Sequence, residues 1–313
     1  MKKKNQIVLG LVYAVLFITG CQKIIEPKDL PEQDPRLVLN CLIDKDSLIT
    51  VNVSSSKSIL SGKDYKFLDN ATCVLYEDDQ LIEQLTNFKN GNFTSKLIPK
   101  INKRYTLKVS ASGFETAEGS TILPDSVTQP RSERYDLANS NYRIFSFGGA
   151  SQPISGVTKC KLWIKDNPGV KNYYTMSPKV MLFDSSGNVL NLNTGAYIYN
   201  NNTSVSSDGY NDGQVIEITD ETLVNGSEIQ LDFNIGISGG SPSVAYAEVY
   251  LTVSNTSEDL YKYNTTLRNQ LYTGVSLFAE PVLVFNNVKN GMGIVGSMYS
   301  TTFFLYKAPI IKQ

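Results

Sequence analysis

The sequence holds 313 residues, in which 29 Lys and Arg stand against 30 Asp and Glu, for a formal net charge of −1. A chain so balanced has no broad electrostatic attraction to nucleic acid or anionic lipid, so no nucleic-acid partner is expected. It contains no histidine, which excludes Ser-His-Asp and Cys-His catalytic sites and the zincin motifs. A hydrophobic content of 41% with 18 Tyr and 13 Phe predicts a folded β protein.

The amino terminus has the layout of a secretory signal. Residues 2–4 are lysines, and residues 7–19 form an apolar run that is shorter than the roughly 20 residues of a membrane-spanning helix. The tetrapeptide Ile-Thr-Gly-Cys that ends at Cys21 resembles a lipobox, which predicts a signal peptide over 1–20 and lipid attached to Cys21. An ordinary signal peptide is the alternative, but the A-x-A cleavage pattern is absent.

The residues after Cys21 predict a membrane location and a tether. Gln22 stands where Asp would resemble an inner-membrane retention signal, so lipid anchoring in the outer membrane is expected. Residues 22–35 carry three prolines and no strand periodicity. The segment 21–35 is therefore predicted to be a semi-extended tether with a reach of about 40 Å, at about 3.1 Å per residue.

Three cysteines remain after Cys21. Cys41, Cys73 and Cys160 lie in apolar, strand-like runs, so they are expected to be buried free thiols. A disulfide between Cys41 and Cys73 is the alternative in an oxidising compartment. Because the chain has no C-x-x-C spacing and no histidine, neither a structural zinc site nor another metal site is predicted.

Alternating apolar residues predict a first β-sandwich over 36–124. Turns are expected at 77–79 and 90–92, and Pro124 closes the unit. Its length of about 90 residues is typical of an immunoglobulin-like or transthyretin-like sandwich. The faces predicted to be buried carry Leu37, Leu39, Cys41, Ile43, Ile49, Val51, Val53, Tyr105, Leu107, Val109 and Ala111.

The remainder, 125–313, is predicted to be a second, larger β-sandwich with one short helix, so the fold class is all-β. Periodicity is weak over 125–159, and 191–213 is expected to be a long polar loop of functional or mobile character. Strands are predicted at 161–165, 179–183, 215–219, 229–235, 245–254 and 297–307.

The predicted helix lies near 257–271. Thr256 and Ser257 are suitable N-caps, and two acidic residues follow at the positive end of the helix dipole. An apolar stripe is expected to pack on the second sandwich; it consists of Leu260, Tyr263, Leu267 and Leu271.

These features together resemble a known family. The order is a lipobox, a tether, a strand pattern ending at Gly113-Phe114, the helix with Tyr261, Tyr263 and Gln270, and the segment 285–296 with its Asn-Gly-x-Gly. It is similar to the Bacteroidota lipoproteins grouped as domain of unknown function family 4249, over nearly all of the mature chain. The resemblance implies display at the cell surface and an accessory or ligand-capture role beside an outer-membrane TonB-dependent receptor, and it implies no catalytic residue. The acidic residues after Cys21 are dispersed, unlike the clustered surface-export signal associated with this phylum.

Candidate chemical sites all have a simpler interpretation. Glu77-Asp78-Asp79 is a predicted solvated turn, and Asp220 and Glu221 are predicted loop residues. Asp208-Gly-Tyr-Asn-Asp-Gly213 offers oxygen donors for calcium, but Tyr210 breaks the spacing of a calcium loop. The glycines of 291–296 lack the Lys-Ser/Thr pair of a phosphate loop, so a turn or bulge with positive φ is expected.

Tyrosines are the remaining candidates for ligand contact. They lie in or beside polar loops, although tyrosine is also common as strand scaffold. They are Tyr173, Tyr174, Tyr197, Tyr199 and Tyr210.

The sequence thus favours a lipid-tethered binding module that is not an enzyme, needs no cofactor and binds an unknown ligand. A structural or adhesive surface subunit is the alternative. A surface glycosidase is the weaker third possibility, since a pair of carboxylates can be assembled only in space.

Overall fold

The structure, a computed structural model, describes residues 34–57, 66–135, 142–144, 146–147, 150–151, 154–190, 194–200, 216–219, 226–239, 243–273, 280 and 282–312. The chain divides into two compact units, of which one is Met1–Pro35 with Lys57–Asp64 and the other is Arg36–Ser56 with Tyr65–Gln313. Nearly all described residues belong to the second unit, which contains every described strand and the helix α2.

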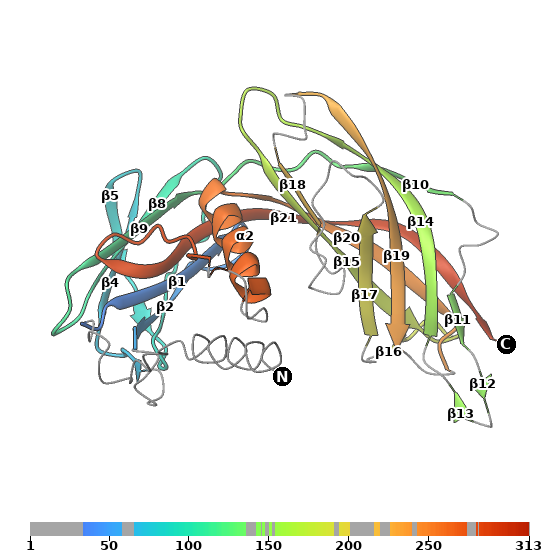
Figure 1. Ribbon diagram of the computed structural model, residues 1–313, viewed down its shortest axis with the longest axis horizontal. Coiled ribbons are helices and arrows are strands. Elements are labelled where there is room, and N and C mark those ends of the chain that lie inside the picture. Colours follow the sequence, from blue (N-terminus) through green and yellow to red (C-terminus); the bar gives the residue numbers. More distant parts are fainter. Residues whose placement is uncertain are drawn as a thin grey trace, which may run out of the picture. The chain divides into compact units, whose positions relative to one another are not determined.

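The first half of this unit is a β-sandwich whose two sheets share one hydrophobic cluster. One sheet has the order β5-β4-β8-β9, and the facing strands are β1, β2, β7 and β6, with β3 beside β2. The bounds are β1 Leu37–Asp44, β2 Thr50–Ser55, β3 Lys66–Phe67, β4 Thr72–Glu77, β5 Gln80–Gln84, β6 Thr86–Asn87, β7 Asn92–Thr94, β8 Arg104–Ser110 and β9 Ala117–Ile122 (Figure 1).

The alternation seen in the sequence sets the faces of these strands. Leu37, Leu39, Cys41 and Ile43 are all buried, while their neighbours along β1 are exposed or half-buried. The predicted buried faces are confirmed for β1, β2 and β8 apart from Ala111, which is half-buried beyond the end of β8. Period-two burial follows directly from the pleat.

The second half surrounds another hydrophobic cluster with longer strands. β14, β17 and β19 supply one side of the cluster, and β15, β20 and β21 supply the other. The bounds are β10 Arg131–Tyr135, β11 Tyr142–Ile144, β12 Ser146–Phe147, β13 Ala150–Ser151, β14 Ile154–Lys165, β15 Tyr173–Phe183, β16 Val189–Leu190, β17 Thr194–Asn200, β18 Ile216–Thr219, β19 Glu228–Gly239, β20 Tyr246–Thr256 and β21 Gly291–Lys312. The predicted all-β class is confirmed.

Two stretches expected to be irregular contain strands. The predicted loop 191–213 was wrong at Thr194–Asn200, because β17 pairs with β19 over seven residues. In 125–159, β10 pairs with β14 and β14 begins at Ile154. Both stretches have weak periodicity of their own and gain their order from long partner strands.

Proline in mid-strand explains why the sequence predicted only part of β15. Pro178 lies opposite Leu251 of β20. On the other edge, β18 pairs with Tyr173–Met176 and β16 with Leu182–Phe183. Among the described strands, Pro178 therefore has a partner on one side alone, which is where a residue without an N–H is tolerated.

β21 links the two clusters. Its first eight residues pair in parallel with the whole of β1, and residues Met298–Pro309 pair antiparallel with β20 (Figure 1). Val295 belongs to the first cluster and Ile310 to the second. The segment 291–296 was expected to be a turn or bulge; it is instead the start of β21, although Gly293 has the expected positive φ, of 109°.

The helix α2, Glu258–Thr273, agrees with the predicted position. Ser257 is its N-cap, since Leu260 N donates to Ser257 Oγ at 3.4 Å, whereas Thr256 ends β20. Leu260 is buried, but Leu271 is 59% exposed, so the expected apolar stripe is buried only near its start. Ser297 N also donates to Ser257 Oγ, at 3.2 Å, which fixes the start of α2 to β21.

The three described cysteines are buried and free, as predicted, and no disulfide joins Cys41 to Cys73. Burial raises the pKa of each thiol from 9.0 to about 12. Such thiols are protonated and unreactive in the folded chain.

Candidate functional site

The acidic turn is built into the β4–β5 hairpin. Glu77 is the last residue of β4 and pairs with Gln80, so the turn itself is Asp78-Asp79, both with positive φ. This two-residue connection is typical of a tight hairpin, one residue shorter than expected from the sequence.

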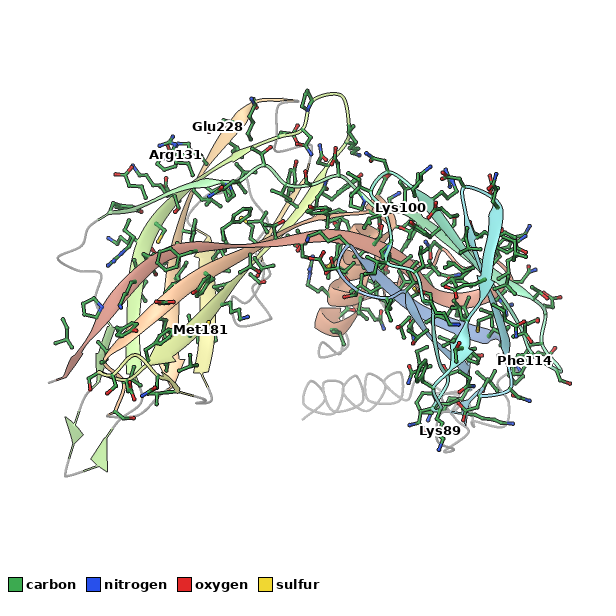
Figure 2. The ribbon with its side chains drawn as sticks, turned by 180° about the vertical axis from the view of Figure 1, so that it is seen from behind. Lys89, Lys100, Phe114, Arg131, Met181 and Glu228 are labelled. Atoms are coloured by element: carbon green, nitrogen blue, oxygen red, sulfur yellow. The ribbon has the colours of Figure 1, made fainter. Side chains whose placement is uncertain are left out.

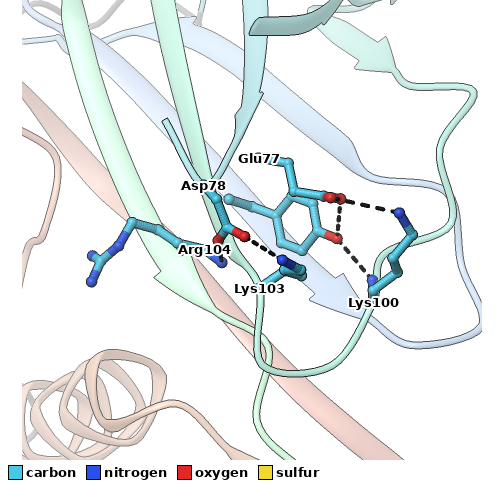
Figure 3. Close-up of polar contacts among 6 residues, drawn as sticks. Glu77, Asp78, Lys100, Lys103 and Arg104 are labelled. Carbon is cyan, nitrogen blue, oxygen red and sulfur yellow. Dashed lines mark hydrogen bonds and ion pairs between the residues drawn. The ribbon is translucent and has the colours of Figure 1, made fainter. Parts of the chain in front are cut away.

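The turn carboxylates bind the neighbouring segment (Figure 3). The Tyr105 hydroxyl donates to Glu77 Oε2 at 2.9 Å and accepts from Lys100 N at 2.8 Å. Asp78 pairs with Lys103 and accepts from Arg104 N, and these two hydrogen bonds hold the pKa of Asp78 below its usual range. The contacts of Glu77 and Asp78 therefore hold the hairpin to the 100–104 segment, which favours the interpretation of a structural turn.

Several predicted candidates lie outside the described residues. They are Cys21, Asp208, Tyr210, Gly213, Asp220 and Glu221. For Tyr199 only the strand position in β17 is described, and Tyr197 is half-buried on the same strand.

Tyr173 and Tyr174 begin β15 and are both buried, so they are not loop residues. The Tyr174 hydroxyl donates to buried Asp166 at 3.2 Å. Tyr173 stacks on Tyr261 of α2, with ring centroids 4.8 Å apart. Tyr174 is therefore scaffold, while Tyr173 lines a polar groove.

This groove of about 610 Å³ lies where β8 and β9, the segment after β9, the 167–172 loop, the end of β20 and the start of α2 meet. Most of the lining residues have polar side chains, although carbon atoms make up the larger part of the lining surface. The lining residues are Asn102, Arg104, Ser120, Thr121, Ile122, Pro124, Asp125, Asn167, Pro168, Val170, Lys171, Asn172, Tyr173, Asn255, Thr256, Ser257, Glu258 and Asp259.

The groove wall contains a network of buried amides. Asn172 Nδ2 donates to Asp166 Oδ1 at 3.0 Å, and Asn255 Nδ2 donates to Asn172 Oδ1 at 3.0 Å and to the Asp125 carbonyl at 3.2 Å. Gly226 N donates to the other oxygen of Asp166 at 3.1 Å. Because each member has a partner at low solvent exposure, the network fixes the wall in one geometry.

Charges of both signs stand at the helix side of the groove. Lys171 Nζ lies 5.3 Å from the centre of the Tyr173 ring. Burial raises the pKa of Tyr173, while the hydrogen bond to Lys171 works in the opposite direction. The pKa of Glu258 is lowered first by Lys262, which lies 3.0 Å away, and then by Tyr173. The site therefore presents an ammonium, a phenol and a carboxylate together.

Asn287 holds three elements at this place. Its Nδ2 lies within hydrogen-bond distance of Asp259 Oδ2 in α2 (2.9 Å), of the Ser120 carbonyl in β9 (3.1 Å) and of the Val295 carbonyl in β21 (2.9 Å). Its Oδ1 accepts from Val295 N at 2.9 Å. Asn287 is part of the segment 285–296 singled out in the sequence, so that segment is explained by tertiary bracing.

Sequence reasoning found Tyr173 and the helix start, because tyrosine and capping residues carry local signals. It missed Lys171, Asn172 and Asn255. The residues next to them in the sequence give no sign that they line a groove. Asn172 and Asn255 are 83 positions apart, and the other lining residues come from separate loops. In the part of the chain that the structure describes, no three Cys, Asp or Glu gather as metal ligands.

The fold and groove define an all-β protein with a polar cleft braced by α2, and no described helix has the length and hydropathy that a membrane span requires. The chain belongs to the family described as domain of unknown function (DUF4249), which matches residues 25–303. This confirms the resemblance found in the sequence. No curated protein matches the chain.

Several solved structures are distantly similar to this chain. BcpA, the major pilin subunit of Bacillus cereus, is 11% identical, with 89% of this chain and 70% of that chain covered and a TM-score of 0.24. The RrgB pilus protein of Streptococcus pneumoniae is 10% identical, with 71% and 48% covered and a TM-score of 0.21. The collagen adhesin of S. aureus is 7% identical, with 88% and 94% covered and a TM-score of 0.18.

Proposed function

We propose that this chain is a lipid-anchored outer-membrane protein that binds a polar ligand in the groove and serves as an accessory to a TonB-dependent receptor. The groove of about 610 Å³ is the observation that carries the proposal. Its volume lies within the range of about 300–1,000 Å³ that is usual for ligand sites.

The chemistry of the groove supports binding of a near-neutral polar ligand. Arg104 and Lys171 are offset by Asp125, Glu258 and Asp259, and most of the remaining lining residues carry an amide or a hydroxyl group. The buried amide network keeps these groups in place before a ligand arrives. A site organised in advance loses less entropy on binding.

We infer a binding role without catalysis. The chain has no histidine, and the carboxylates Glu77 and Asp78 are committed to hairpin contacts. Among the acidic residues of the groove, Glu258 pairs with Lys262, and Asp259 accepts a hydrogen bond from Asn287 Nδ2. These contacts suit a recognition surface better than a pair of catalytic carboxylates.

The proposed lipid anchor and the proposed receptor partner are inferred from the sequence. The apolar segment before Cys21 and Gln22 after it support lipidation and outer-membrane sorting, and the family resemblance supports a receptor partner. Two or more acyl chains are needed for lasting attachment, at about 0.8 kcal/mol per buried CH₂.

The experiment is affinity purification of the tagged full chain from detergent-extracted membranes, followed by identification of partners and native mass spectrometry of the bound ligand. We expect co-elution of a TonB-dependent receptor and a small bound species. The paired change Lys171→Ala with Glu258→Ala should remove the bound species. The matched control, Lys179→Ala with Glu133→Ala, changes exposed charges away from the groove and should retain it.

Each part of the proposal has its own contrary outcome. Repeated isolation of the tagged chain alone would overturn the receptor role. Equal ligand retention by the groove and control variants would overturn the groove as the binding site. Mass spectrometry that finds Cys21 of the mature chain without acyl groups would overturn the anchor.

One observation favours the alternative of a structural surface subunit. β5 ends the four-stranded sheet, and its Leu81 and Ile82 are 65% and 43% exposed. Such an edge can pair with another chain. Concentration-dependent growth of polymers in light scattering, abolished by Ile82→Lys, would favour that function over ligand binding.

A further inference from the structure

The point at which the tether joins the body is defined by backbone pairing. β1 begins at Leu37, and the residue before it is fixed to the end of β2: Arg36 N donates to Ser56 Oγ at 2.8 Å, and Ser56 N donates to the Arg36 carbonyl at 2.8 Å. The proposed lipid at Cys21 is thus connected to this end of the sheet by residues 22–35.

The registers of the paired strands place several other chain segments at the same end of the sheet as Arg36. Leu37 pairs with Gly291 of β21 on one side and with Ser55 of β2 on the other, and Ser55 pairs with Lys66 of β3. The turn between β6 and β7, which carries Lys89 (Figure 2), adjoins β3, since Val53 N donates to the Gly91 carbonyl at 2.7 Å and Leu68 N donates to the Val53 carbonyl. Residues from β1, β3, β21 and this turn therefore lie together at one end of the sandwich.

Four basic residues belong to this end of the sandwich. Arg36, Lys66, Lys89 and Lys289 are all exposed. Acidic groups lie nearby as well: Asp34 is exposed two residues before Arg36, Asp69 Oδ1 accepts from Gly91 N at 2.7 Å, and Glu118 pairs with Lys108 at 3.2 Å. Because the chain as a whole is balanced, this local excess of positive charge is a property of the fold.

Large apolar side chains are exposed among the basic ones. Phe67 is 48% exposed, Phe88 66% and Met292 47%. Single exposed apolar residues are common, but a group of them interspersed with lysine and arginine is the composition of a surface that meets lipid.

We propose that this end of the sandwich docks on a bilayer that carries anionic phospholipid headgroups. The residues that make the contact, named the root surface, are Arg36, Lys66, Phe67, Phe88, Lys89, Lys289 and Met292. The basic groups face the headgroup phosphates, and the two phenylalanines enter the interfacial region. The proposal rests on the anchor of the proposed function and adds an orientation to it. A tether with a reach of about 40 Å keeps the root surface close to the lipid, so that a weak contact is populated.

The test is sedimentation of the mature chain from residue 21, with Cys21→Ser, in the presence of phosphatidylcholine vesicles with or without about 30% phosphatidylglycerol. We expect binding to the anionic vesicles that weakens with added salt. Arg36→Glu, Lys66→Glu and Lys89→Glu together should weaken it at least tenfold. Phe67→Ser with Phe88→Ser should weaken it several-fold even at high salt.

The matched control makes the same charge change elsewhere. Lys96, Lys165 and Lys179 are exposed and lie outside the root surface, and their joint change to Glu should leave most of the binding intact. Thermal unfolding of each variant shows whether it is folded, and the salt dependence of the parent chain tests the proposal without any variant.

Two results would overturn the root surface: no binding of the parent chain to anionic vesicles, or equal loss in the root and control variants. Neither result touches the receptor or the groove, which are tested with the lipidated protein. Loss of receptor co-purification with vesicle binding retained would instead contradict the proposed function alone.

Discussion

Tyr105 shows how a single side chain connects the core to the surface of the first sandwich. Its ring is fully buried in the cluster of β1, β4 and β8. Its hydroxyl lies between the Glu77 carboxylate and the Lys100 amide, at 2.9 and 2.8 Å. A buried phenol needs such partners, because an unsatisfied hydroxyl costs about 1–3 kcal/mol.

Tyr105→Phe is expected to lower the free energy of unfolding by about 1–3 kcal/mol near neutral pH, because Glu77 loses its donor and Lys100 loses its acceptor. Burial, ahead of the bond to Glu77, raises the pKa of Tyr105 from 10.0 to about 12. A phenol with a raised folded pKa contributes stability that is complete below pH 10.0 and is lost as the pH rises toward 12. Urea unfolding should therefore show a steeper loss across this window in the parent than in the variant.

The buried thiols provide a shared baseline for that comparison. Their pKa values rise from 9.0 to about 12, so their contribution begins to fall near pH 9.0 in both proteins. Identical pH profiles in the two proteins above pH 10.0 would contradict the role given to Tyr105.

At the scale of elements, the parallel pairing of β1 with β21 depends on close backbone approach. A Cβ at Gly293 would lie 2.1 Å from the Leu39 carbonyl oxygen, and φ at this position is 109°. Only glycine fits both conditions. Gly113 has a positive φ of 84° as well, but a Cβ there would meet nothing within 4 Å.

Gly293→Ala is expected to destabilise the protein by about 3 kcal/mol or more, since backbone strain and a steric clash act together. Gly113→Ala should cost about 1–2 kcal/mol, from the strained backbone alone. Urea midpoints measure both, and amide exchange in β1 should accelerate in the first variant. Similar costs at the two positions would show that the approach of β21 to β1 is less tight than the structure indicates.

At the scale of the whole molecule, β21 joins two hydrophobic clusters that are otherwise separate. It covers one side of β1 along all eight residues, and Val288 and Val295 complete the first cluster. Further along, Tyr306, Ala308 and Ile310 belong to the second cluster. The segment 36–124 therefore lacks part of its own core when it stands alone.

A fragment of residues 36–124 is accordingly expected to be unfolded in isolation, because β1 would become an open edge and the sites of Val288 and Val295 would be empty. Residues 36–313 serve as the folded control. Near-ultraviolet circular dichroism and dispersion of amide proton resonances measure the difference. A fragment with native-like dispersion would show that β21 is dispensable for the first sandwich.

The sequence by itself determined the strand faces of β1, β2 and β8, a helix start at Thr256 or Ser257, the free buried cysteines and the family. Each of these follows from a local pattern: period-two burial, a capping residue, an apolar run or a spaced motif. Of the groove, Tyr173 and the residues from Thr256 to Asp259 carried such a signal. Their roles in the groove did not follow from it.

Only the tertiary structure decided the parallel pairing of β1 with β21, the strand β17, the amide network of Asn172 and Asn255, and the bracing by Asn287. These depend on partners that are distant in the chain, and an asparagine has the same local pattern in a loop, a cap or a buried network. Local periodicity specifies which face of a strand is apolar, but hydrogen-bond partners are specified by topology, because they form only when separate elements have packed together.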